Sequence, residues 1–107
     1  MKKYEIMFIV KTTIGEDEVK ATSKKFQDVL KKDGAKNIEI EEMGQRELAY
    51  EIKDCKTGFY FVITCDAEDK AVKEFDRLAL IDSNIIRHLI INKEKNEVIY
   101  EKSNISW

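Results

Sequence analysis

The sequence predicts an α+β fold of the ferredoxin-like type, a four-stranded antiparallel sheet with two helices on one face. Its segments follow one another in the order β-α-β-β-α-β, judged by hydrophobic periods of two and of about 3.6 residues. Each β-α-β half requires a crossover, and right-handed crossovers place the first and third strands at the centre of the sheet. The second strand is polar on both sides, which suits an edge. We therefore expect the second and fourth strands at the two edges.

The first strand and the first helix have the clearest patterns. Residues 3–10 alternate in hydrophobicity and are largely apolar on both sides, which indicates a central strand. Residues 16–32 carry apolar side chains at steps of three and four, with acidic residues in the first turn and lysines in the last. Gly34 follows as a left-handed cap. This pattern predicts a helix over 16–32.

The remaining elements have shorter patterns. A polar strand over 35–52 is interrupted at Gly44, which predicts a bulge or kink there. Residues 59–65 form an aromatic and β-branched run, typical of a strand that pairs with the one before it. A second helix follows, and a polar loop separates it from a final strand over 85–93.

The length of 107 residues fits a single domain. We assign residues 1–94 to the ferredoxin-like domain and 95–107, which has no regular period and ends in Trp107, to a C-terminal tail that we expect to be flexible. No window approaches the roughly 20 apolar residues that span a bilayer, and the start of the chain lacks the features of a secretory signal. We therefore expect a cytoplasmic protein with no membrane partner.

Charge and composition exclude several functions. Lys and Arg number 19 against 21 Asp and Glu, a net charge of −2, which argues against a domain that binds nucleic acid strongly by itself. One histidine and two cysteines outside a Cys-x-x-Cys motif predict no metal site. No glycine-rich phosphate loop is present, so we expect no cofactor and no small-molecule substrate.

Catalysis lacks the residues it needs, and we predict that the chain is not an enzyme. Two of its three acidic clusters, Glu16-Asp17-Glu18 and Glu68-Asp69, are explained by helix first turns, where carboxylates are favoured by the helix dipole. An acylphosphatase-like enzyme of the same fold would need an arginine and an asparagine in the loop after the first strand. Residues 12–15 contain neither.

The run Gly58-Phe59-Tyr60-Phe61-Val62 resembles the signature of RNA-recognition motifs, whose aromatic side chains stack on bases. The match is partial, because Thr57 precedes the glycine where a basic residue is expected and Thr64 stands where an aromatic is expected. Stacking by Phe59 and Phe61 is one interpretation. Packing of both rings in the core is the other.

The block 41–52 contains Arg46, one of three arginines, close to the predicted bend at Gly44. The planar guanidinium offers a fork that suits phosphate. The alternative is a solvated arginine paired with Glu42 or Glu47. Both interpretations stay open on the residues alone.

Short motifs in a fixed order run through the chain, namely Lys3-Tyr4-Glu5, Glu42 through Gly44, Arg46, Leu48-Ala49-Tyr50, Ile52, Gly58-Phe59-Tyr60 and Asn84-x-Ile86-Arg87. In these motifs, their spacing and the total length, the chain resembles the family of the sixth protein of the bacterial small ribosomal subunit, over residues 1–93. The resemblance implies a structural constituent of the small subunit, located on the ribosome. It further implies binding to the central domain of the small-subunit ribosomal RNA (rRNA), in the platform, as a heterodimer with the eighteenth small-subunit protein.

The resemblance points to Lys2, Lys3, Arg46 and Arg87 as basic positions of the family, and the charges and exposed edge of the chain add the other residues of two expected sets. The RNA-binding set expected within residues 1–94 is Lys2, Lys3, Arg46 and Arg87, with His88 and Lys93 as weaker additions from the last strand. The set expected to face the partner protein is Glu41, Glu42, Glu47, Leu48 and Tyr50. Two positions depart from the family pattern: Glu47 replaces a second basic residue and Glu51 a proline. Two alternative functions stay open, a generic single-strand RNA binder like the RNA-recognition motif and a ferredoxin-like regulatory domain for a small ligand.

Overall fold

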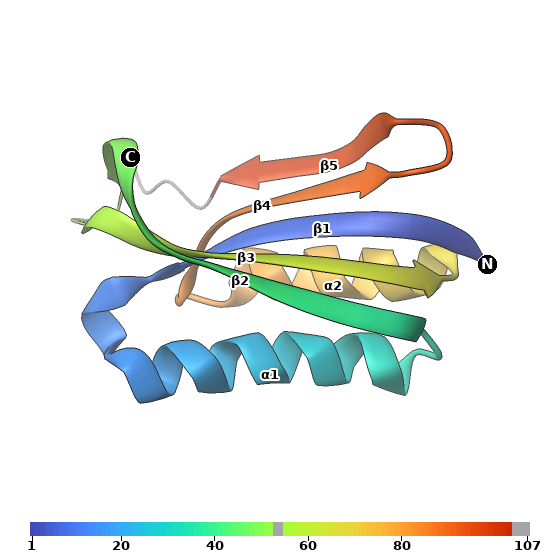
Figure 1. Cartoon of the computed structure of the whole chain (residues 1–107), viewed down its shortest axis with the longest axis horizontal. Coiled ribbons are helices and arrows are strands. Elements are labelled where there is room, and N and C mark those ends of the chain that lie inside the picture. Colours follow the sequence, from blue (N-terminus) through green and yellow to red (C-terminus); the bar gives the residue numbers. More distant parts are fainter. Residues whose placement is uncertain (53–54, 104–107) are drawn as a thin grey trace.

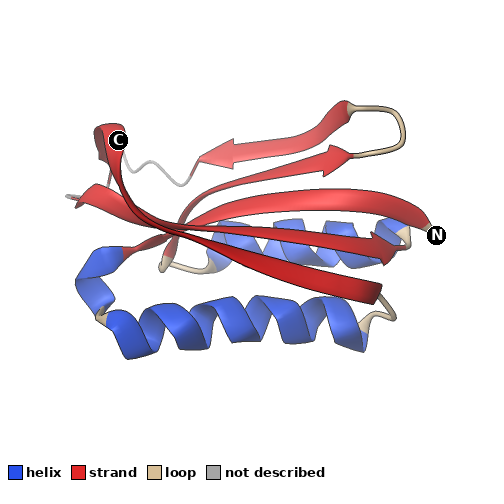
Figure 2. Cartoon of the chain, in the orientation of Figure 1, coloured by secondary structure: helices blue, strands red, loops and turns tan. Residues whose placement is uncertain are grey.

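The computed structural model describes residues 1–52 and 55–103, with side chains described up to 48 and over 56–101. The elements, in chain order, are β1 Lys2–Lys11, a 3-10 turn Thr12–Ile14, α1 Glu16–Lys32, β2 Lys36–Ile52, β3 Cys55–Ala67, α2 Asp69–Ile81, β4 Ile85–Asn92 and β5 Glu97–Ser103. Both helices cover one face of a single sheet and leave the other face without a helix (Figures 1 and 2). We call that uncovered side of the sheet the open face.

The sheet has five strands in the order β2-β3-β1-β4-β5, and every neighbouring pair is antiparallel. The α+β class, the central positions of β1 and β3, and the edge position of β2 are confirmed. The prediction of four strands with β4 at an edge is wrong. The fifth strand, β5, pairs with β4 and takes the edge from it.

A register shift between β4 and β5 explains why the sequence pattern does not predict β5. The pairs Ile90–Tyr100 and Ile91–Val98 leave Ile99 as an extra residue, so Val98 and Ile99 are both exposed and the alternation expected of a strand is broken. The turn before it is set by Asn92, whose Oδ1 accepts hydrogen bonds from the backbone N–H groups of the two residues at 94 and 95. Seven residues of the segment 95–107 thus lie in the sheet. Trp107 lies outside the described residues, and the mobility of the segment stays a prediction.

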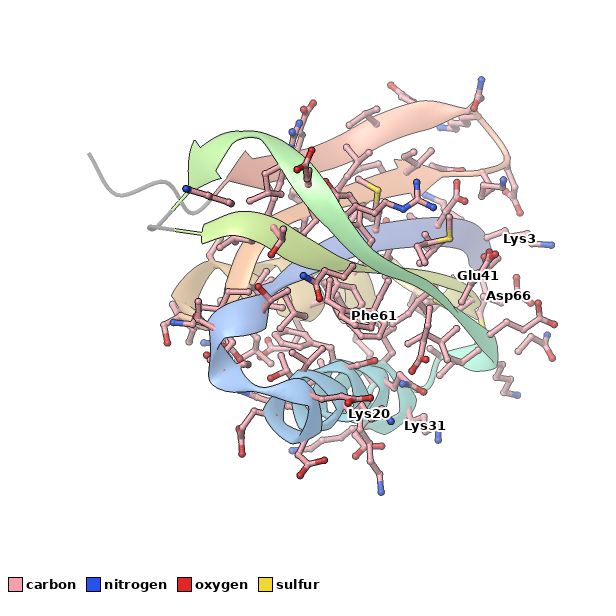
Figure 3. All side chains as sticks on the ribbon, turned by 60° about the vertical axis from the view of Figure 1, so that its left-hand side comes forward. Lys3, Lys20, Lys31, Glu41, Phe61 and Asp66 are labelled. Atoms are coloured by element: carbon pink, nitrogen blue, oxygen red, sulfur yellow. The ribbon has the colours of Figure 1, made fainter. Side chains whose placement is uncertain are left out.

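The core lies between the sheet and the two helices and is dominated by phenylalanines. Phe8 of β1 is fully buried, and its ring centroid is 5.2 Å from Phe61 of β3, 6.0 Å from Phe26 of α1 and 5.9 Å from Phe75 of α2. Figure 3 shows Phe61 between the sheet and α1. One aromatic cluster therefore holds both helices against the central strands.

Candidate nucleic-acid interface

The side chains of the open face follow from strand alternation and register. In β1, Phe8 faces the helices, so Ile9 and Lys11 lie on the open face. Arg87 of β4 pairs with Ile9, and Arg46 of β2 pairs with Gly58, which in turn pairs with Lys11. The register therefore brings Arg46 and Arg87 to the open face at the same end of the sheet.

The backbone positions Arg46 by a bend just before it. Gly44 has a φ of 89°, a conformation that favours glycine, and the pairing of β2 with β3 shifts between Glu42 and Gly44. The predicted bulge at Gly44 is confirmed. Arg46 itself is exposed, and no described carboxylate lies within ion-pair distance of it. The described side chains therefore leave its guanidinium available for an external anion.

Gly58 has a role that reasoning from the sequence missed. A Cβ atom at this position would lie 2.3 Å from Cγ2 of Ile9 and 3.3 Å from Cδ2 of Leu48. Only glycine lets these side chains pack together with Ile86 on the open face, beside Arg46. A glycine inside a strand is the signal that could have indicated this close approach.

Arg87 is partly exposed and has a carboxylate partner. Its Nη2 donates to Oε1 of Glu101, on β5, at 2.6 Å. Its Nε is buried, and no described residue accepts a hydrogen bond from it. Glu101 is the second residue that the sequence did not reveal, because its position depends on β5.

The three predicted lysines lie at the other end of the sheet. Lys3 and Ile9 are six residues apart along β1, which corresponds to about 20 Å. Lys2 lies on the helix side, with Nζ 3.5 Å from Asp69, and Nζ of Lys93 is 3.7 Å from Glu5. In Figure 3, Lys3 lies at the same end of the sheet as Asp66. Carboxylates thus accompany this second group of cations.

His88 is removed from the set of RNA contacts by its burial. It pairs with Phe8 across the strands and faces α2, with 1% of its side chain exposed. Its Nε2 lies 2.7 Å from Oδ1 of Asp76, and its ring lies edge-on to Phe75. The imidazole therefore joins β4 to α2 and cannot reach a ligand on the surface.

The residues expected to face a partner protein lie along the edge strand β2. Glu41 pairs with Val62 and belongs to the open face, whereas Glu42 and Glu47 pair with residues of the helix side, and all three carboxylates are exposed. Leu48 packs against Ile9 and Ile86. The backbone of Tyr50 lies in β2, and its side chain lies outside the described ones.

The aromatic run of β3 faces the core. Phe61 is fully buried, and Phe59 packs against it with ring centroids 5.2 Å apart. Both rings lie on the helix side of the sheet. Of the two interpretations of these rings, the structure supports core packing, since neither can stack on a base at the open face.

Two groups titrate abnormally because of burial. Burial raises the pKa of Tyr4 above its usual range, and its hydroxyl donates to Asp69, which holds the pKa of that carboxyl below its usual value. Burial also raises the pKa of the Cys65 thiol to about 11, so that thiol is protonated and inert at neutral pH.

Among residues 1–52 and 55–103, no group of His, Cys, Asp and Glu could hold a metal ion. Within the same residues, no helix combines the length and the apolar character needed to span a bilayer.

Comparison with known proteins decides the family. The sequence profile of the family described as ribosomal protein S6 matches residues 3–92. The chain belongs to the ribosomal protein S6 family. The crystal structure of 30S ribosomal protein S6 from Thermotoga maritima is similar, with a TM-score of 0.81 and 27% identity, covering 88% of this chain and 89% of that one.

Membership of the S6 family confirms several predictions. S6 proteins are structural and non-enzymatic, so the chain is not an enzyme. It has a structural role in the small ribosomal subunit, it takes part in translation, and its place is the cytoplasmic ribosome. The resemblance inferred from the motifs between Lys3 and Arg87 is thereby confirmed.

Proposed function

We propose that the chain binds the central domain of the small-subunit rRNA, in the platform, and that the open face of the sheet around Arg46 and Arg87 contacts the phosphates. The observation that carries this proposal is the register that brings these two arginines to one end of that face. The third arginine, Arg77, lies on α2 and pairs with Glu74. Phosphate contacts of this kind position a protein on RNA without reading its bases.

The lysines of the second group contribute less in this proposal. Lys2 and Lys93 each have a carboxylate within ion-pair distance, as Arg87 does, but they lack the planar fork with which a guanidinium binds phosphate through two N–H groups, so they would compete less well for an RNA phosphate. Lys3 remains in the proposed set, at the far end of the open face from Arg46. Contact points at Lys3 and at Arg87, about 20 Å apart along the strands, would fix the orientation of the domain on the RNA.

A chain with a net charge of −2 needs a basic partner to bind RNA strongly, and we propose the eighteenth small-subunit protein in that role. Glu41, Glu42 and Glu47 line the edge strand β2, beside the apolar contact of Leu48 with Ile9. Complementary charges of this kind raise the rate of encounter more than the final affinity. The partner would supply the positive charge that this chain lacks.

Removing both open-face arginines is expected to weaken binding of the heterodimer to an rRNA central-domain fragment. In the variant Arg46→Ala/Arg87→Ala, the slope of log affinity against log salt should become shallower by about 1.4–1.8, because each phosphate contact contributes about 0.7–0.9. The measurement is filter binding over a salt series. Arg77→Ala is the matched control and should leave both slope and affinity unchanged; equal effects of the two variants would contradict the proposal.

Reversing one charge on the β2 edge is expected to slow association with the partner. Glu42→Lys should lower the association rate several-fold at low salt, with a smaller effect at high salt, because screening removes the steering. Stopped-flow mixing with the purified partner measures the rate. Glu94→Lys, in the exposed turn before β5, is the control for net charge. Absence of a one-to-one complex at micromolar concentration would overturn the partner assignment.

A further inference from the structure

Glu101 lies where an anion that binds Arg87 would have to sit. Its Oε1 accepts from Nη2 of Arg87 at 2.6 Å, and the two side chains are 55% and 38% exposed. A carboxylate and a phosphate both bind the guanidinium fork through charge-assisted hydrogen bonds. The two anions therefore compete for the same edge of one side chain.

The hydrogen bonding of Arg87 is incomplete in this arrangement. Nη2 is used by Glu101, while Nε is buried and no described residue accepts from it. A guanidinium binds best when two parallel N–H groups meet two oxygens of one anion. Because Nε is buried, a phosphate that replaces the carboxylate would meet N–H groups of the two Nη atoms, and it would then use more of the fork than Glu101 uses.

The strand that carries Glu101 is the one least held by the sheet. β5 pairs with β4 alone, and its other edge has no strand beside it in the described structure. Val98 and Ile99 are exposed, and the register shift beside them interrupts the ladder. Strands with few buried contacts open at lower free energy than core strands. The carboxylate can thus leave Arg87 without unfolding the core.

We propose that β5 is an anionic cap on the RNA-binding face: Glu101 occupies the phosphate position of Arg87 in the free protein, and RNA displaces it. This inference rests on the proposed RNA contact of Arg87 and names how that contact is regulated. The cap lowers the affinity of the free chain for non-cognate anions. A phosphate of the rRNA displaces Glu101 from Arg87 only at a site where the same RNA also binds Arg46.

The test is a double-mutant cycle on RNA binding by the heterodimer. Glu101→Gln removes the charge and keeps the shape, and it should tighten binding about threefold, since exposed ion pairs are weak. In an Arg87→Gln background the same change should have no effect. Glu97→Gln, at the other end of β5, removes an equal charge and should leave the affinity unchanged, while thermal melts verify that every variant folds.

Several results would overturn the cap. Equal tightening by Glu101→Gln and Glu97→Gln would mean a general charge effect, and tightening that persists without Arg87 would mean that Glu101 acts elsewhere. Weaker binding of Glu101→Gln would mean that Glu101 positions Arg87 productively.

A second readout separates the cap from the proposed RNA function. In the free protein, inorganic phosphate is titrated while the side-chain N–H resonance of Arg87 is followed by NMR. Glu101→Gln should respond at about threefold lower phosphate than the wild type. If Glu101→Gln shows this lower phosphate requirement while the wild-type heterodimer does not bind the rRNA fragment, the cap stands and the RNA function fails. If Glu101→Gln and the wild type give the same phosphate titration, the cap is overturned whatever the RNA result.

Discussion

Phe8→Ala is expected to destabilise the domain by about 3–5 kcal/mol, the range typical of a large aromatic removed from a core. Phe8 is fully buried at the centre of the sheet and contacts a ring from β3, from α1 and from α2. Its loss leaves a cavity where rings from both helices and from β3 meet. Urea denaturation of the wild type and the variant measures the change, with the slope of the transition as a check on two-state unfolding.

Two controls make this expectation specific to the aromatic cluster. Phe8→Leu keeps most of the volume and should cost much less than the alanine variant. Phe59→Ala removes a ring at the rim of the cluster, where Phe59 is only half-buried, and should also cost less. A loss of under 1 kcal/mol for Phe8→Ala would mean that the cluster does not hold the layers together.

His88→Ala is expected to cost about 3–5 kcal/mol, far more than loss of a surface histidine. The side chain is 1% exposed, and its removal leaves both a cavity and the Asp76 carboxylate, itself only 14% exposed, without its partner. Breaking a buried pair by deleting one member is costly because the other stays desolvated. Urea denaturation again gives the magnitude.

A double variant separates the two parts of this cost. In His88→Ala/Asp76→Ala the unpaired carboxylate is gone, so the double variant should be no less stable than His88→Ala alone, although it has lost one more side chain. RNA binding of the folded His88→Ala heterodimer should match the wild type, because His88 faces α2. Weakened RNA binding at unchanged folding would return His88 to the RNA-binding set.

Local patterns were enough to predict the order of the elements and the centre of the sheet. The helix over 16–32 is read from its apolar steps and its charged ends, and α1 has those bounds. The polar residues around Glu41 place β2 at an edge. These features depend on neighbours in the chain, which the sequence displays directly.

Features that depend on pairing between distant strands were missed. Residues 85–92 carry isoleucine or leucine on both sides of the strand, so only the pairing of Phe8 with His88 decides which way the histidine faces. The strand around Val98 was missed because a bulge breaks its alternation. The placement of Arg46 and Arg87 at the same end of the open face likewise depends on three strand pairings, β2 with β3, β3 with β1 and β1 with β4.

In the proposed function the open face of the sheet meets the rRNA and the helix face does not. The most direct test places a photo-crosslinking amino acid at Lys11, which lies on the open face across Gly58 from Arg46, and separately at Lys24, which is exposed on α1. Each variant is assembled with the partner onto the rRNA and irradiated. Crosslinks to the central domain are expected from position 11 and none from position 24; crosslinks from position 24 alone would contradict the proposed function.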